Sequence, residues 1–155
     1  MERNRRLALA ESSFKEALLR DPTYALAEIR LGRIQYLRDN DDAARATITS
    51  AEKRTQEPGH LFLAAMFLGA IHQRQADLDA ARACFERALA IVPNSQAAVV
   101  ALAYIESSTG RPDRAQALAR AFAASTTAND RFWGAYKNGG LDEPGLSWLR
   151  RRVWK

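Results

Sequence analysis

The chain has 155 residues, 30 of them Ala against 4 Val and 6 Ile, which favours helices because β-branched residues are typical strand formers. At 47% hydrophobic and 26% charged residues, the composition is that of a folded domain, and we expect neither a membrane-spanning segment nor a leader. The net charge of +5 comes from arginines and a lysine at the two ends, so the nearly neutral body gives no broad electrostatic footprint for nucleic acid.

Apolar periodicity and turn residues predict helices along the whole chain. Acids and Pro in the expected first turns, as at Asp79 and Pro112, mark helix starts, and Pro58-Gly59 and Gly110 mark helix ends. His60 follows Pro58-Gly59, and we expect it to lie exposed in a turn. The predicted helices cover residues 3–20, 23–38, 41–56, 60–75, 78–91, 95–108, 112–125, 130–138 and 143–154.

The sequence repeats itself. Ala10-x3-Phe14-x2-Ala17-x4-Pro22 aligns with Ala81-x3-Phe85-x2-Ala88-x4-Pro93, and Ala44 and Ala115 begin copies with the same spacing. Between these blocks lies a second series of two-residue landmarks. Its members are Leu31-Gly32, Leu68-Gly69 and Leu102-Ala103. Successive copies are 34 or 37 residues apart. Each copy is predicted to form two helices that pack through small residues.

This unit of Leu-Gly, then Ala-x3-Phe, then Pro resembles the tetratricopeptide repeat. The resemblance implies an all-α, short right-handed solenoid of helix–turn–helix repeats with a C-terminal capping helix. It also divides the chain into five parts. These are the second half of a truncated or atypical repeat at 1–24, repeats at 25–58, 62–95 and 96–129, and a short helix plus the capping helix at 130–155.

The half-repeat at the start leaves the apolar stripe of Leu7, Phe14 and Leu18 without the preceding helix that a full repeat would supply. Repeat arrays need covered ends. We favour the interpretation that the chain is cut from a longer array. If it stands alone, we predict a weak homodimer through residues 3–20, in which each first helix covers the other's stripe.

No catalytic constellation is recognisable, and we predict that the protein is not an enzyme, takes no cofactor or small-molecule substrate, and binds no metal. His72 sits where the family has a packing aromatic, and Cys84 has no neighbour in sequence that would lower its pKa, so we expect a half-buried free thiol. Asp39, Asp41 and Asp42 lack the Gly and closing Glu of a calcium loop and are better explained as a helix start.

In the resembled family, the first helix of each repeat lines a concave face that binds a peptide or a partner's helix. Helical spacing selects the candidates on this face, most of them apolar or aromatic. They are Leu26, Ile29, Arg33, Tyr36, Leu63, Met66, Ala70, Gln73, Val100 and Tyr104. Only Arg33 could bind a peptide's terminal carboxylate, so we do not expect a carboxylate clamp. The alternative is that some of these side chains are core between helices.

The C-terminal segment is least like the family. Pro144 in a first turn, then Leu146, Leu149 and Val153 at helical spacing, predict a helix that caps the last repeat. The competing interpretation is a basic docking tail for a membrane, nucleic acid or an acidic partner. Its residues would be Trp148, Arg150, Arg151, Arg152 and Trp154.

Two functions follow from these patterns. The leading hypothesis is a non-catalytic, cytoplasmic protein–protein interaction module with a scaffold or assembly role, whose partner is another protein or a peptide. The alternative is a nucleic-acid or anionic-surface binder that acts through the basic ends, including Arg3, Arg5 and Arg6. The neutral body argues against this alternative.

Overall fold

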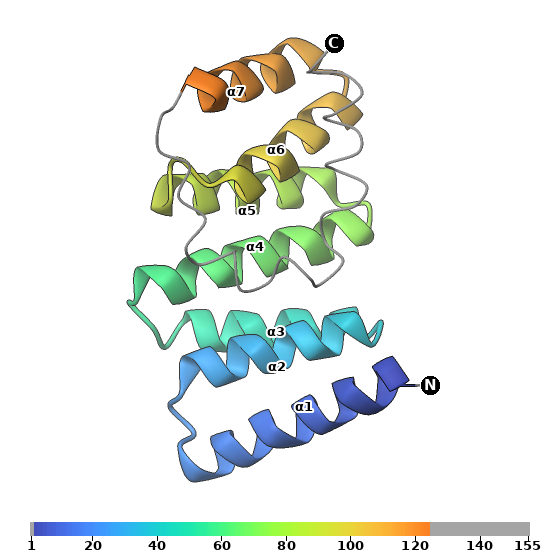
Figure 1. The fold of residues 1–155 in the computed structure, drawn as a ribbon, viewed down its shortest axis with the longest axis vertical. Helices are drawn as coiled ribbons and strands as arrows, with labels where there is room; N and C mark the ends of the chain where they lie inside the picture. The colour runs from blue at the N-terminus through green and yellow to red at the C-terminus, as the bar shows by residue number, and fades with distance from the viewer. Residues whose placement is uncertain (1, 125–155) are drawn as a thin grey trace.

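The computed structural model describes residues 2–124, which form seven helices without a strand. Figure 1 shows them stacked along the long axis of the molecule, from α1 at one end to α7 at the other. This arrangement confirms the predicted all-α solenoid. The helices are α1 (Glu2–Arg20), α2 (Ala25–Leu37), α3 (Asp41–Glu52), α4 (Pro58–Arg74), α5 (Leu78–Ile91), α6 (Gln96–Ser108) and α7 (Pro112–Ala124).

The helices pack as the pairs α2–α3, α4–α5 and α6–α7, and the repeat landmarks form the contact within each pair. Ala44, Ile48 and Ala51 of α3 are completely buried. Gly32 lies so close to α3 that a Cβ atom there would be 2.4 Å from Ile48 Cγ1, and one at Gly69 would be 2.5 Å from Phe85 Cε1. The Leu-Gly landmark therefore lets the two helices of a pair approach each other more closely than any larger residue would.

The turn inside each pair has one repeated conformation. Asp39, Ala76 and Gly110 have φ values of 61°, 61° and 76°, and each follows a first helix. In every copy the next N–H donates to a carbonyl five residues back, for example from Asp77 to His72 O at 2.9 Å. This is the Schellman motif, and it reverses the chain in two residues.

The predicted helix boundaries differ from the structure by more than two residues at one connection. Helix α3 ends at Glu52 rather than at residue 56, and Pro58 and Gly59 do not end a helix but lie in the first turn of α4. The buried Thr55 holds the intervening loop: its Oγ1 accepts from the Glu57 N–H at 3.2 Å and lies 3.1 Å from His60 Nδ1. His60 is therefore half-buried in α4, and the prediction of an exposed turn residue was wrong.

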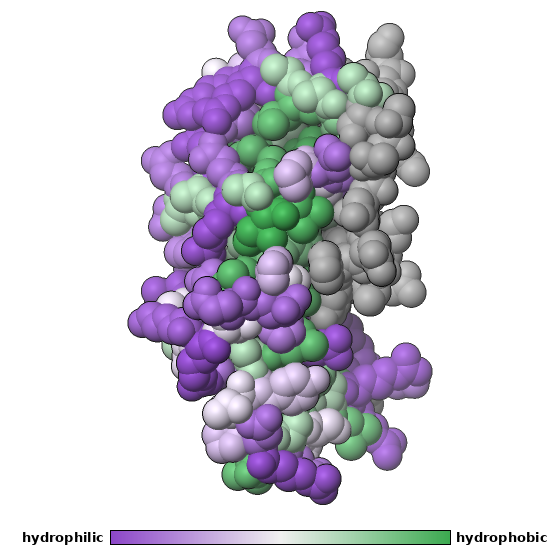
Figure 2. Space-filling model, turned by 90° about the vertical axis from the view of Figure 1, so that its left-hand side faces the viewer, coloured by the Kyte–Doolittle hydropathy of each residue, from purple (hydrophilic) through white to green (hydrophobic). Residues whose placement is uncertain are grey.

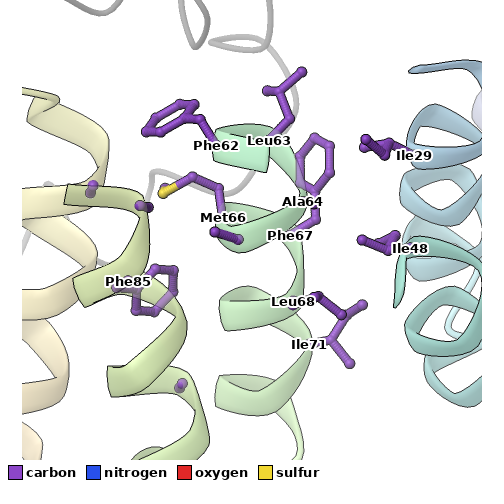
Figure 3. Packing of buried hydrophobic residues seen from close by; sticks show 14 of the residues in the cluster. Ile29, Ile48, Phe62, Leu63, Ala64, Met66, Phe67, Leu68, Ile71 and Phe85 are labelled. Carbon is purple, nitrogen blue, oxygen red and sulfur yellow. The ribbon is translucent and has the colours of Figure 1, made fainter. Parts of the chain in front are cut away.

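Helix α4 lies at the centre of the hydrophobic core. Figure 3 shows Phe62 and Met66 pointing to one side of it, while Phe67, Leu68 and Ile71 point toward Ile29 and Ile48. Its buried residues surround the helix axis instead of forming one stripe. This explains why α4 is mostly apolar, whereas the second helices α3 and α5 are amphipathic.

Helix α1 differs from all the others, because none of its residues is buried. It packs against α2, where Glu11 forms an ion pair with Arg38. Leu7, Phe14 and Leu18 are only partly covered, and Leu9 and Leu19 are 62% and 84% exposed.

Candidate protein-interaction surface

The first helices α2, α4 and α6 carry all ten residues predicted to line the binding face. Ile29, Leu63 and Met66 are at most 5% exposed and belong to the core cluster. The other seven are partly exposed, and we call them the inner stripe. They are Leu26, Arg33, Tyr36, Ala70, Gln73, Val100 and Tyr104. The accessible part of the predicted face is therefore narrower in its middle, on α4, than at its two ends.

At the α2 end, Arg33 and Tyr36 of the inner stripe each form a contact between a guanidinium and an aromatic ring with a residue of α4. The guanidinium of Arg33 lies 5.5 Å from the centre of the Phe67 ring, a cation–π distance. The Tyr36 ring lies 3.7 Å from the guanidinium carbon of Arg74. Burial raises the pKa of the Tyr36 hydroxyl, against the opposing effect of Arg74, so the hydroxyl stays protonated at neutral pH.

Arg74 is fixed by several partners at the turn between α2 and α3. Its Nη1 lies 3.0 Å from Asp39 Oδ1, its Nη2 donates to the Tyr36 carbonyl at 2.8 Å, and its Nε donates to Asp41 Oδ2 at 2.9 Å. These contacts tie α4 to the preceding repeat. They also give Asp39 and Asp41 a partner, an arginine of the next repeat.

At the α6 end, the inner stripe is uncharged. Val100 and Tyr104 are partly exposed, and Ala97, Ala101 and Tyr104 border the core cluster. Figure 2 shows a band of hydrophobic residues on the side of the molecule drawn there, at the height of α4 to α6, with hydrophilic residues beside it. The stripe thus changes from basic and aromatic at α2 to aliphatic and aromatic at α6.

A network of ionisable side chains holds neighbouring helices together between α5 and α7. Glu106 is completely buried, its Oε1 accepts from Arg82 Nε at 3.0 Å, and Arg111 and Arg114 lie 3.7 Å from its carboxylate. Arg82 also donates to Thr109 Oγ1 at 2.9 Å. This network joins α5, α6 and the start of α7. Sequence patterns did not reveal this network, because Arg82 and Glu106 lie 24 residues apart, on different helices.

Reactive side chains are few among residues 2–124. Cys84 is a half-buried free thiol, as predicted, and burial raises its pKa, which disfavours the reactive thiolate. His72 Nδ1 lies 3.6 Å from Asp77 Oδ2 at the end of α4. The described residues hold no cluster of three metal-ligating side chains, and none of their helices is long and apolar enough to cross a membrane.

The C-terminal predictions lie outside the described residues. They concern the helices at 130–138 and 143–154 and the basic docking tail of Trp148, Arg150, Arg151, Arg152 and Trp154.

Comparison with known proteins finds one matching family model and two solved structures of similar fold. The sequence profile of the tetratricopeptide repeat matches residues 73–138. The resemblance to the tetratricopeptide repeat is confirmed for this segment. The matched segment includes α5, α6 and α7, with the landmarks Phe85 and Leu102-Ala103. No curated protein matches the chain in sequence.

Two solved structures share the fold of this chain. A crystal structure of the MamA protein superimposes with a TM-score of 0.66 at 19% identity, covering 88% of this chain and 69% of that one. A second crystal structure of MamA gives a TM-score of 0.62 at 16% identity, covering 91% of this chain and 83% of that one. At 19% and 16% sequence identity, what this chain shares with the two MamA structures is the fold.

Proposed function

We propose that this chain is a non-catalytic protein-interaction module that binds a peptide or a partner's helix along the inner stripe, in a scaffold or assembly role. The observation that carries the proposal is the run of partly exposed apolar and aromatic side chains on successive first helices, from Leu26 to Tyr104. A solvated helix face would carry Glu and Lys at these positions. Aromatic side chains held by packing are the residues that dominate binding energy at interfaces.

The two ends of the inner stripe indicate which chemical groups a partner would carry. Arg33 at the α2 end favours an acidic group, and Val100 and Tyr104 at the α6 end favour apolar side chains. Between these two ends, Leu63 and Met66 of α4 are buried and offer a partner little contact area. A segment with an acidic end and a hydrophobic end, bound as a helix or as an extended chain, fits this arrangement.

A peptide-display selection against the chain, followed by titration of the selected peptides, tests the proposal. We expect Tyr104→Ala to weaken binding about tenfold or more, because truncating a tyrosine that anchors an interface costs roughly 2 kcal/mol. Tyr24→Ala is the matched control, since Tyr24 is 46% exposed and lies outside the stripe. Equal affinities for the parent and Tyr104→Ala, with circular dichroism unchanged, would show that the partner binds elsewhere.

The alternative of binding through basic ends has limited support among the described residues. Arg3, Arg5 and Arg6 are exposed on α1, but Arg6 pairs with Glu2 at 2.6 Å. We therefore place the proposed function on the inner stripe.

A further inference from the structure

The inner stripe presents its chemical groups in a fixed order from α2 to α6. Arg33, on α2, is its one charged member. Ala70, on α4, is small and partly exposed, so an occupant can lie close to the helix there. Tyr104, on α6, ends the stripe beside the aliphatic Val100. An occupant that follows the stripe therefore meets a basic, then a small, then an aromatic side chain.

The chain itself carries a segment with the complementary order. Asp142 and Glu143 are the only adjacent acids in the sequence after α7, and Leu146 and Trp148 follow them. The residue before Pro144 is biased toward an extended conformation. In an extended segment the side chains alternate, so the even-numbered residues from Asp142 to Trp148 share one face. That face offers an acid first, then apolar groups, and an aromatic ring last.

We propose that residues 142–148 occupy the inner stripe of the same chain, with Asp142 at Arg33 and Trp148 beside Tyr104. The inference rests on the proposed function, because it uses the same surface. It adds a regulation of that surface, since an external partner must displace this segment before it can bind.

The spacing of the segment agrees with that of the stripe. An α-helix with its side chains is about 10–12 Å wide, so α2 and α6 lie roughly 20 Å apart with α4 between them (Figure 1). Extended residues rise about 3.3 Å each, so the segment from Asp142 to Trp148 also spans about 20 Å. Leu146 then falls near α4, where the small Ala70 leaves room for it.

Charge decides the direction of the segment along the stripe. Arg150, Arg151 and Arg152 follow the apolar part of the segment. With Trp148 at α6, these arginines lie beyond α6 and away from Arg33. The opposite direction would bring them toward Arg33, where like charges repel.

The chain after α7 is long enough to bring the acid to α2. Because α7 packs against α6, α2 lies about three helix widths, or roughly 35 Å, from α7. Residues 125–141 can span at most about 55 Å when extended. With the predicted helix at 130–138, they still span about 40 Å. Asp142 can therefore reach Arg33.

Attachment to the same chain makes even a weakly binding segment an effective competitor. A short tether gives an effective concentration of about 1 mM. A segment with an intrinsic dissociation constant of about 100 µM would then leave the stripe open about a tenth of the time. An external partner would bind about tenfold more weakly than it would bind the open stripe.

Cross-linking in the full chain tests the placement. In a Cys84→Ser background, Leu146→Cys combined with Ala70→Cys should form an intramolecular disulfide on mild oxidation. The matched pair combines Leu146→Cys with Ala46→Cys, on the exposed side of α3, and should react at least about tenfold more slowly, because a disulfide needs Cα atoms within about 7 Å. Equal rates, a disulfide only between two copies, or a faster reaction with Ala121→Cys on α7 would overturn the proposal.

A synthetic peptide of residues 140–150 tests the competition. It should bind the full-length Trp148→Ala variant about tenfold more tightly than the parent chain, because the variant releases the stripe. Ser147→Ala is the matched control, since Ser147 falls on the opposite face of the extended segment and its replacement should change nothing. Equal affinities for the parent and Trp148→Ala would overturn the proposal.

The two experiments also separate this inference from the proposed function. A fast disulfide between Leu146→Cys and Ala70→Cys, together with selected external peptides that tolerate Tyr104→Ala, would contradict the proposed function and support the inference. Selected peptides that depend on Tyr104, together with equal disulfide rates, would support the proposed function and overturn the inference.

Discussion

Ala76 occupies a backbone conformation that the chain imposes on three different residue types. Its φ of 61° matches that of Asp39, while the third copy has Gly110 at φ 76°. A left-handed conformation places the Cβ of a non-glycine residue close to the following carbonyl. The Schellman turn is therefore retained at a local energetic cost in the second repeat, which glycine avoids in the third.

Ala76→Gly should raise the free energy of unfolding by about 0.5–1 kcal/mol, because relief of the left-handed strain outweighs the entropy that glycine loses on folding. Urea denaturation of the two proteins measures the difference. Ala46→Gly is the matched control, since Ala46 is exposed in the interior of α3 and its replacement should cost about 0.5–1 kcal/mol. Destabilisation by both variants would contradict the strain assigned to Ala76.

At the scale of helices, the stack is joined by two ion networks of different burial. Arg74 links α4 to the turn between α2 and α3 near the surface, with a side chain that is 33% exposed. Glu106 links α6 to α5 and α7 with a carboxylate that is completely buried. Burial makes the second network depend on complete pairing, because a charged group left alone in the interior is costly.

Glu106→Ala should lower the free energy of unfolding by about 3–5 kcal/mol, because Arg82 would lose its fully buried carboxylate partner and keep only Asp79, whose side chain is 87% exposed. Glu86→Ala removes the more exposed partner of Arg114 and should cost less than about 1 kcal/mol. Thermal and urea unfolding of both variants measure the two losses of unfolding free energy. Similar losses for the two would mean that the Glu106 network contributes no more than a surface pair.

For the whole molecule, burial is unevenly distributed along the stack. Helix α4 is buried on all sides near the middle, whereas α1, at one end, has no buried residue. Repeat proteins are stabilised by contacts between neighbouring elements, so an end helix with one neighbour opens most easily.

Native-state hydrogen exchange should therefore find the slowest amides in α4 and the fastest helical amides of residues 2–124 in α1. Amides of α1 that exchange as slowly as those of α4 in the dilute chain would contradict this order of stability.

Much of this fold was predictable from sequence because repeat landmarks encode local pairing. Ala81, Phe85 and Ala88 identified the buried face of α5, and Leu68-Gly69 identified the helix that crosses it. The end of α3 was not predictable, because the loop after it depends on a contact between Thr55 and His60 across a turn. Helix periodicity carries no information about such a contact.

The sequence by itself determined the helices, their pairing and the absence of a recognisable catalytic motif, since these depend on spacing over one or two turns. Only the tertiary structure decided which residues of the first helices remain accessible. Leu63 and Ala70 share one helical stripe, but Leu63 is in the core and Ala70 is partly exposed. The stacking of successive repeats makes this distinction, and it likewise brings Arg74 to Asp39 and Arg82 to Glu106, across separations of 35 and 24 residues.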